Sequence, residues 1–218
     1  MNKIKFIFLL LFVFITFNSF SQKKYKDEFF YEIGQSLKSK PTFTFRFDNR
    51  NSFITNYRAW IYGVKIGLQF KDKFRTGLDF SMLHTGIYIN QNIEHEGEIY
   101  NAISSKLHLE YASIFAEYVF YKTEKWEFTL PIQIGGGVSY FKYTIDNKNY
   151  INNMAPVIMY EANITGQYKL VKGIGVGTGI GYRIMLLSNP KINQHFTSPV
   201  FSLKLILYPF DFIKINKN

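Results

Sequence analysis

The chain contains no cysteine. This absence excludes disulfide cross-links, thiolate metal sites and cysteine-based redox chemistry. Beyond the N-terminal segment, no stretch stays apolar for the roughly 18 residues that a membrane-spanning helix requires. We therefore expect neither a disulfide-stapled domain nor a helical membrane protein.

Clustered positive charge is also missing. The formal net charge is +10, yet Lys and Arg are scattered along the chain, and no known nucleic-acid-binding motif is present. A nucleic-acid partner normally requires a basic patch or stripe, so we predict none. Scattered basic residues are instead compatible with contact with an anionic lipid surface.

The first 21 residues have the features of a cleaved secretory signal. Lys3 and Lys5 precede an apolar core at Phe6–Phe17, and small residues before Gln22 predict cleavage near Ser21. No cysteine follows the core, so a lipoprotein acylation site is excluded. About 197 residues remain, enough for one eight-stranded barrel and too few for a large porin.

Alternate residues of the remaining chain divide into two faces. In residues 57–70, one face carries Arg58, Trp60, Tyr62, Val64, Ile66, Leu68 and Phe70, and the other carries Ala59, Ile61, Gly63, Lys65, Gly67 and Gln69. A soluble barrel would hide its large apolar side chains. A polar lumen inside an apolar, lipid-facing band fits better, and the 19% aromatic content suits aromatic girdles at both membrane interfaces.

The same alternation predicts eight strands. They span Thr42–Asp48, Tyr57–Phe70, Lys73–Ile89, about Lys106–Tyr121, Trp126–Tyr143, Pro156–Leu170, Gly173–Leu187 and Pro199–Tyr208. The fourth changes phase: Leu107, Leu109 and Tyr111 share a parity opposite to that of Ile114. We predict a bulge near Ala112–Ser113, because one extra residue would return all of them to one face.

The connections alternate in length. Those after the second, fourth and sixth strands are short, whereas residues 49–56, 90–105, 144–155 and 188–198 form longer polar connections. Outer-membrane barrels have short periplasmic turns and longer outer loops. We therefore predict an all-β, closed, antiparallel, up-and-down transmembrane barrel over residues 41–210, with both termini in the periplasm.

Two segments flank this barrel. Residues 22–40 form a predicted periplasmic N-terminal segment, in which Asp27 caps a short helix with Phe30, Ile33 and Leu37 on one stripe. Three placements stay open for it: a periplasmic leader, a helix against the barrel, or a partial plug. Residues 211–218 form a C-terminal tail.

This layout resembles the small eight-stranded outer-membrane barrels of the OmpA/OmpX-like type, especially the uncharacterised barrels of Bacteroidetes. The resemblance rests on the signal ending at Ser19–Gln22, the paired strands with hairpin turns such as Phe70–Phe74, and an aromatic-rich final strand. It implies insertion by the barrel-assembly machinery. Such barrels usually end on a terminal aromatic, whereas here Tyr208–Phe210 is followed by a tail, so the insertion signal would be internal or the tail would fold away.

Inward positions of the predicted strands carry charges of both signs. The predicted lumen network comprises Arg46, Asp48, Lys65, Arg75, Asp79, Glu117, Glu127, Glu161, Lys169, Arg183 and Lys204. An eight-stranded barrel is just wide enough for side chains to fill it, and buried charges require partners. We expect a structural salt-bridge network that closes the lumen, with an ion path as the alternative.

We predict no catalytic residue, metal site or cofactor. His108, Glu110 and either Ser104 or Ser105 supply the residue types of a lipid hydrolase. Glu94–Glu98 combines carboxylates with an imidazole, which we interpret as a solvated loop. Alternating glycines from Gly173 onward lie within a strand, so we expect them to make room for neighbouring side chains and not to bind phosphate.

These observations predict a non-enzymatic outer-membrane barrel whose outer loops contact an extracellular protein or surface ligand, with outer-membrane lipid around it. The longest loop, about Asn90–Ser105, is the expected binding segment. Two alternatives remain: an enzyme acting on outer-membrane lipid from a site at the rim, and a small pore or secretion-assembly component.

Overall fold

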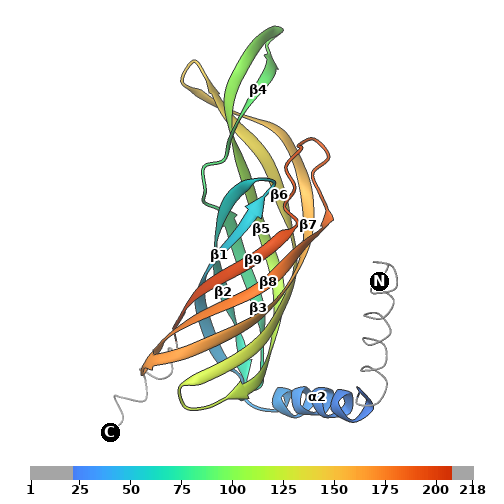
Figure 1. Ribbon diagram of the computed structural model, residues 1–218, viewed down its shortest axis with the longest axis vertical. Coiled ribbons are helices and arrows are strands. Elements are labelled where there is room, and N and C mark those ends of the chain that lie inside the picture. Colours follow the sequence, from blue (N-terminus) through green and yellow to red (C-terminus); the bar gives the residue numbers. More distant parts are fainter. Residues whose placement is uncertain (1–21, 208–218) are drawn as a thin grey trace, which may run out of the picture.

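The computed structural model describes residues 22–207, and it consists of one helix and nine strands (Figure 1). The elements are α2 (Gln22–Leu37), β1 (Thr42–Ile54), β2 (Tyr57–Phe70), β3 (Phe74–Leu83), β4 (Tyr88–His95), β5 (Glu98–Lys122), β6 (Trp126–Ile145), β7 (Lys148–Val171), β8 (Ile174–Leu187) and β9 (Ser198–Leu207). The predicted signal segment 1–21 and tail 211–218 lie outside the described residues. Within residues 22–207, no helix is long and apolar enough to cross a membrane.

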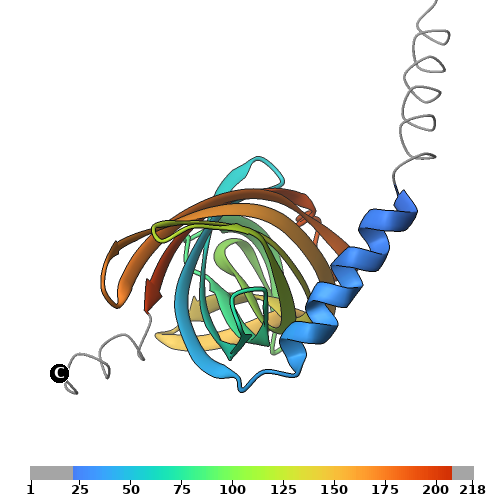
Figure 2. The same ribbon diagram turned by 90° about the horizontal axis from the view of Figure 1, so that it is seen from below.

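Eight of the strands close into a ring. Each pairs antiparallel with its neighbours in the order β3-β2-β1-β9-β8-β7-β6-β5, and pairing of β3 with β5 completes the circle (Figure 2). The ninth strand, β4, pairs with β5 beyond the end of β3. The predicted closed antiparallel eight-stranded barrel is therefore confirmed, with one extra strand outside the ring.

The two ends of the barrel differ. The β2–β3, β5–β6 and β7–β8 connections lie at what we call the short-turn end, and the opposite end is the hairpin end. At the hairpin end, the predicted long loops 90–105 and 144–155 are instead strand hairpins. Both turn on two residues with positive φ, Glu96-Gly97 and Asp146-Asn147, as a type I′ turn requires.

The third predicted strand is observed as two separate strands. Residues 73–89 become β3 and β4, which are separated by residues 84–87. β3 ends where it stops pairing with β2 at Leu83, and β4 then continues along β5. Both segments have strand periodicity, so alternation alone could not locate the break.

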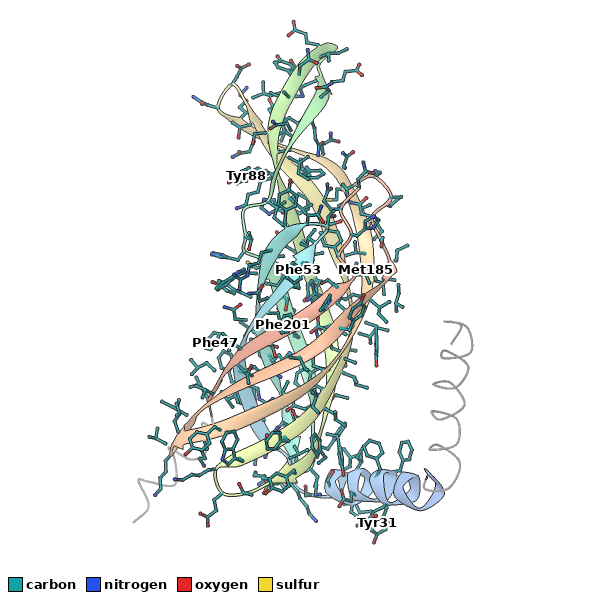
Figure 3. The ribbon with its side chains drawn as sticks, in the orientation of Figure 1. Tyr31, Phe47, Phe53, Tyr88, Met185 and Phe201 are labelled. Carbon is teal, nitrogen blue, oxygen red and sulfur yellow. The ribbon has the colours of Figure 1, made fainter. Side chains whose placement is uncertain are left out.

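The outer surface of the barrel is apolar. Leu203 is 64% exposed and Ile114 is 61% exposed, and Phe47 and Phe201 also lie on this surface (Figure 3). Exposed apolar side chains around a closed ring are typical of a barrel surrounded by lipid. The predicted outward direction of the large side chains therefore holds over the barrel wall.

The interior has two layers of opposite character. The layer toward the short-turn end is charged, whereas the layer toward the hairpin end is apolar. The apolar layer comprises Ile54, Ala59, Ile61, Leu83, Ile87, Leu107, Leu109, Tyr111, Phe141, Val157, Met159, Ile192 and Phe196. The expectation of a polar lumen is therefore wrong for the hairpin half.

The bulge predicted near Ala112–Ser113 is not observed, and the two interior layers explain the pattern that suggested it. β5 pairs without interruption through Ala112 and Ser113 with both β3 and β6, and its register shift lies at Val119–Tyr121 instead. Leu107 and Leu109 point inward and are buried. The parity change in this segment reflects a change in the polarity of the lumen, and the strand itself keeps its phase.

Glycines on β8 allow close approach of neighbouring strands. A methyl group at Gly179 would collide with Thr165, and one at Gly181 would collide with the Asn163 side chain. The expectation that these glycines make room for side chains of neighbouring strands is confirmed. Both glycines lie inside a strand, away from any helix N-terminus.

Candidate functional site

The charged layer is formed by inward positions of the ring strands. Its members are all buried: Arg46, Asp48, Arg50, Lys65, Arg75, Asp79, Glu117, Glu127, Glu161, Arg183 and Lys204. Alternation along each strand points these side chains to the lumen, while their apolar neighbours face outward. Six cations face five carboxylates, so the layer is close to charge balance.

One cluster lies nearest the short-turn end. Arg46 donates to Glu117 at 2.7 and 3.0 Å, and Arg75 donates to Glu117 at 3.0 Å. Arg75 also forms a two-pronged contact with Glu127, at 2.5 and 2.6 Å. Gln167 donates to Glu117 at 3.2 Å. Side chains from β1, β3, β5, β6 and β7 therefore meet across the lumen.

A second cluster is centred on Arg50. Its guanidinium donates to Asp79 at 2.6 Å and to the Ser81 hydroxyl at 2.5 Å. It also donates to the Tyr111 hydroxyl at 2.9 Å, and its guanidinium carbon lies 5.7 Å from the centre of the Tyr111 ring. Tyr111 belongs to the apolar layer, so this contact joins the two layers.

Two more ion pairs surround this cluster. Arg183 donates to Glu161 at 2.8 and 3.0 Å, and the Lys65 ammonium lies 3.1 Å from Asp48. Lys204 is buried on the same inward face of β9, but among the described residues no carboxylate lies within 4.0 Å of its ammonium. The network therefore contains one cation that no direct ion pair neutralises.

Lys169 is placed elsewhere. It is partly exposed and lines a cavity of about 730 Å³ at the short-turn end, together with Gln167, Glu127 and Lys125. It therefore lies at the mouth of the barrel and outside the buried layer to which the sequence assigned it.

The β8–β9 connection covers the hairpin end of the lumen. Ile192 and Phe196 from this segment are buried in the apolar layer. The Asn189 amide fixes the segment by donating to the Ser139 carbonyl at 2.9 Å, the Ser139 hydroxyl at 3.0 Å and the Asn153 carbonyl at 2.8 Å. This predicted long connection is therefore an ordered part of the interior.

Beyond the lumen, the β4–β5 and β6–β7 hairpins form what we call the head, residues 88–105 and 140–155 (Figure 1). The head has a small core of its own, in which Ile93, Tyr143 and Ile145 are buried. The His95 ring lies 4.3 Å from the ring of Tyr150, so the tip of one hairpin contacts the other.

The residues considered for lipid hydrolysis do not assemble into a triad. His108 stacks on Tyr140 at 4.8 Å on the outer surface, whereas Ser105 is fully buried on the inward face. The His108 Nδ1 atom is 4.0 Å from Glu110, which instead accepts a hydrogen bond from Tyr140 at 2.9 Å. Within residues 22–207, no group of three His, Cys, Asp or Glu residues is arranged to hold a metal ion, so Glu94–Glu98 forms no such site.

Comparisons with known proteins identify the fold through structure. No family model matches the chain, and no curated protein matches it either. The neisserial surface protein A crystal structure superposes with a TM-score of 0.54 at 13% identity, covering 78% of this chain and 99% of that one. The chain has the fold of a small eight-stranded outer-membrane barrel.

Two further small outer-membrane barrels are similar at lower scores. The N-terminal barrel domain of OprF from Pseudomonas aeruginosa gives a TM-score of 0.46 at 10% identity, covering 77% of this chain and 98% of that one. Ail, the attachment invasion locus protein of Yersinia pestis, in complex with the heparin analogue sucrose octasulfate, gives 0.44 at 12% identity, covering 76% and 94%.

Sequence reasoning missed Arg50, a central residue of this small outer-membrane barrel. The predicted first strand ended at Asp48, whereas β1 continues to Ile54. Arg50 has the same parity as Arg46 and Asp48, so extending the alternation by one step would have placed it in the lumen. The polar segment that follows Asp48 resembled a loop and concealed this signal.

Proposed function

We propose that this protein is an integral outer-membrane barrel that contacts an external partner through its head. In this arrangement the hairpin end is extracellular, and the short-turn end and both termini are periplasmic, as in other outer-membrane barrels. The barrel-assembly machinery would insert it. The role is one of interaction and structure, and no catalytic step is assigned.

The observation that carries the proposal is the construction of the head. A connection that served only to join strands would need two to five residues. Here two hairpins extend past the ring and bury Ile93, Tyr143 and Ile145 against each other. Such a preorganised surface loses little conformational entropy on binding. At its tip, Ile99 is 70% exposed, which leaves an apolar anchor available to a partner.

The lumen supports the same proposal because side chains bridge it in the charged layer and pack across it in the apolar layer. The charged layer links five strands near the short-turn end, and Phe196 and its neighbours fill the hairpin half. We infer that the charge network and the apolar layer close the barrel to solutes. Function then resides on the outside of the molecule.

The test removes the tip of the head and keeps the barrel. Gln91 lies directly opposite Ile103, so residues 92–102 can be replaced by Asn-Gly, which forms a two-residue type I′ hairpin. Cells expressing the wild type or this variant are compared for attachment to surfaces and to other cells. The change in gel mobility between unheated and boiled samples confirms that each barrel is folded.

We expect the shortened variant to fold and to lose attachment. A matched substitution, Ile99→Ser, should weaken attachment and leave the hairpin length unchanged. Full attachment by the folded, shortened variant would contradict the proposed role of the head.

A further inference from the structure

The helix α2 lies outside the barrel, against the wall at the short-turn end. It runs crosswise to the long axis of the molecule and points away from the ring (Figures 1 and 2). The Phe29 ring packs edge-on against Tyr118 at 4.6 Å. Glu32 accepts hydrogen bonds from the Tyr118 hydroxyl at 2.5 Å and from Lys73 at 3.1 Å. Of the three placements left open by the sequence, the structure therefore shows a helix against the barrel and excludes a plug for residues 22–37.

The helix has one apolar side. At 100° per residue, Phe29, Phe30, Ile33 and Leu37 fall within an arc of about 100°. Opposite them lie Glu28, Tyr31 and Gln35, and Figure 3 shows Tyr31 pointing away from the barrel. The apolar side is only partly covered by protein, since Phe30 remains 60% exposed and Leu37 remains 47% exposed.

This apolar side continues the lipid-facing surface of the barrel. Tyr118 occupies an outward position on β5, on the same face as Ile114. Phe29 packs on Tyr118, and the Phe30 ring follows at 5.2 Å from that of Phe29. The apolar band of the wall therefore continues onto the helix through Tyr118, Phe29 and Phe30.

Positive charge lies where a membrane surface would be. Lys38 and Lys40 follow the helix directly, and both are exposed. Lys73 lies in the adjacent β2–β3 turn and holds Glu32. A helix with an apolar face and flanking lysines is typical of a segment that lies in the plane of an anionic lipid interface.

We propose that α2 is an interfacial anchor that lies in the periplasmic leaflet of the bilayer, with Phe30, Ile33 and Leu37 among the acyl chains and Tyr31 toward the periplasm. Phe29 and Glu32 dock the helix to the wall, and this docking fixes its depth. The partner is the lipid bilayer itself. The proposal rests on the membrane orientation given under Proposed function.

Tryptophan fluorescence tests this placement at two adjacent positions. The native Trp60 and Trp126 are first replaced by Phe, and a single tryptophan is then introduced as Phe30→Trp or, as the matched control, Tyr31→Trp. Each protein is reconstituted into phosphatidylcholine vesicles containing phosphatidylglycerol, with or without bromine on the acyl chains. The gel-mobility change on boiling confirms folding and insertion.

We expect the tryptophan at position 30 to emit at shorter wavelength than the one at position 31 and to lose at least half of its intensity to brominated chains, while position 31 is quenched several-fold less. Equal quenching at both positions, or no quenching at position 30, would overturn the proposal. A tryptophan at position 30 whose emission shifted to shorter wavelength only after periplasmic protein was added would also overturn the proposal, in favour of a protein partner. If the Trp-free parent and both tryptophan variants all failed to insert into the vesicles, the result would instead count against the membrane barrel itself.

Discussion

At the scale of single residues, Arg50 shows how the charged layer is held together. Its guanidinium reaches Asp79 and Ser81 on β3 and Tyr111 on β5, and it lies 3.7 Å from Glu161 on β7. Side chains from three other strands thus depend on one planar group on β1. An ammonium could not reproduce these contacts, because it lacks the fork geometry of a guanidinium.

Replacing Arg50 tests this dependence. We expect Arg50→Met to lower the free energy of unfolding by about 3–5 kcal/mol, because it leaves buried carboxylates without their counter-charge. Urea unfolding of the detergent-folded protein, followed by gel mobility of unheated samples, measures the change. The control is Arg58→Met, since Arg58 is exposed and lies 5.8 Å from the Trp60 ring, and it should cost less than about 1 kcal/mol. Equal losses for both variants would show that the network is not a major source of stability.

At the scale of elements, the helix α2 depends on a carboxylate that can be titrated. The hydrogen bond from the Tyr118 hydroxyl, followed by that from Lys73, holds the pKa of Glu32 below its ordinary value. A depressed pKa means that the ionised form stabilises docking. This contribution is fully present above the ordinary carboxyl range and is lost as the pH falls through the lowered pKa.

We therefore expect α2 to remain docked at neutral pH and to loosen in acid, below the ordinary range of a glutamate. Because the chain has no cysteine, a spin-label pair can be placed at Gly34→Cys and Lys122→Cys without other changes. The distance distribution between the labels should broaden on acidification. In a Glu32→Gln background it should already be broader at neutral pH and should not change with pH. A wild-type distribution independent of pH would refute a docking role for Glu32.

Elements also show what sequence could and could not predict. The bounds of Tyr57–Phe70 were predicted as observed, because large outward side chains alternate with buried ones along β2 even though its inward face changes from Ile61 to Lys65. The outward placement predicted for Leu107 and Leu109 on β5 was wrong, since alternation distinguishes two faces but does not say which of them is inside. The head was missed because polar hairpin residues such as those near Asp146 have the composition of a loop, although Asp-Asn is suited to a tight turn.

At the scale of the whole molecule, the two interior layers act in series. Breaking the charged layer alone leaves the apolar layer in place, and the reverse also holds. We expect the purified protein to show no steady single-channel current in planar bilayers, and Phe196→Ser alone to remain closed. A general porin in the same bilayer serves as the positive control. Discrete, reproducible current steps from the wild type would contradict a closed lumen and favour the pore alternative.

The position of α2 also has a consequence for how molecules pack side by side. A barrel alone presents nearly the same wall in every direction, but α2 has 16 residues and extends about 24 Å from the side of β3 and β5. A neighbour approaching from that side would meet the helix before it reached the wall. Among the described residues, no such element lies beside β7 to β9. The two sides of the molecule therefore differ within the plane of the membrane, and close lateral contacts are directed to the side formed by β7 to β9.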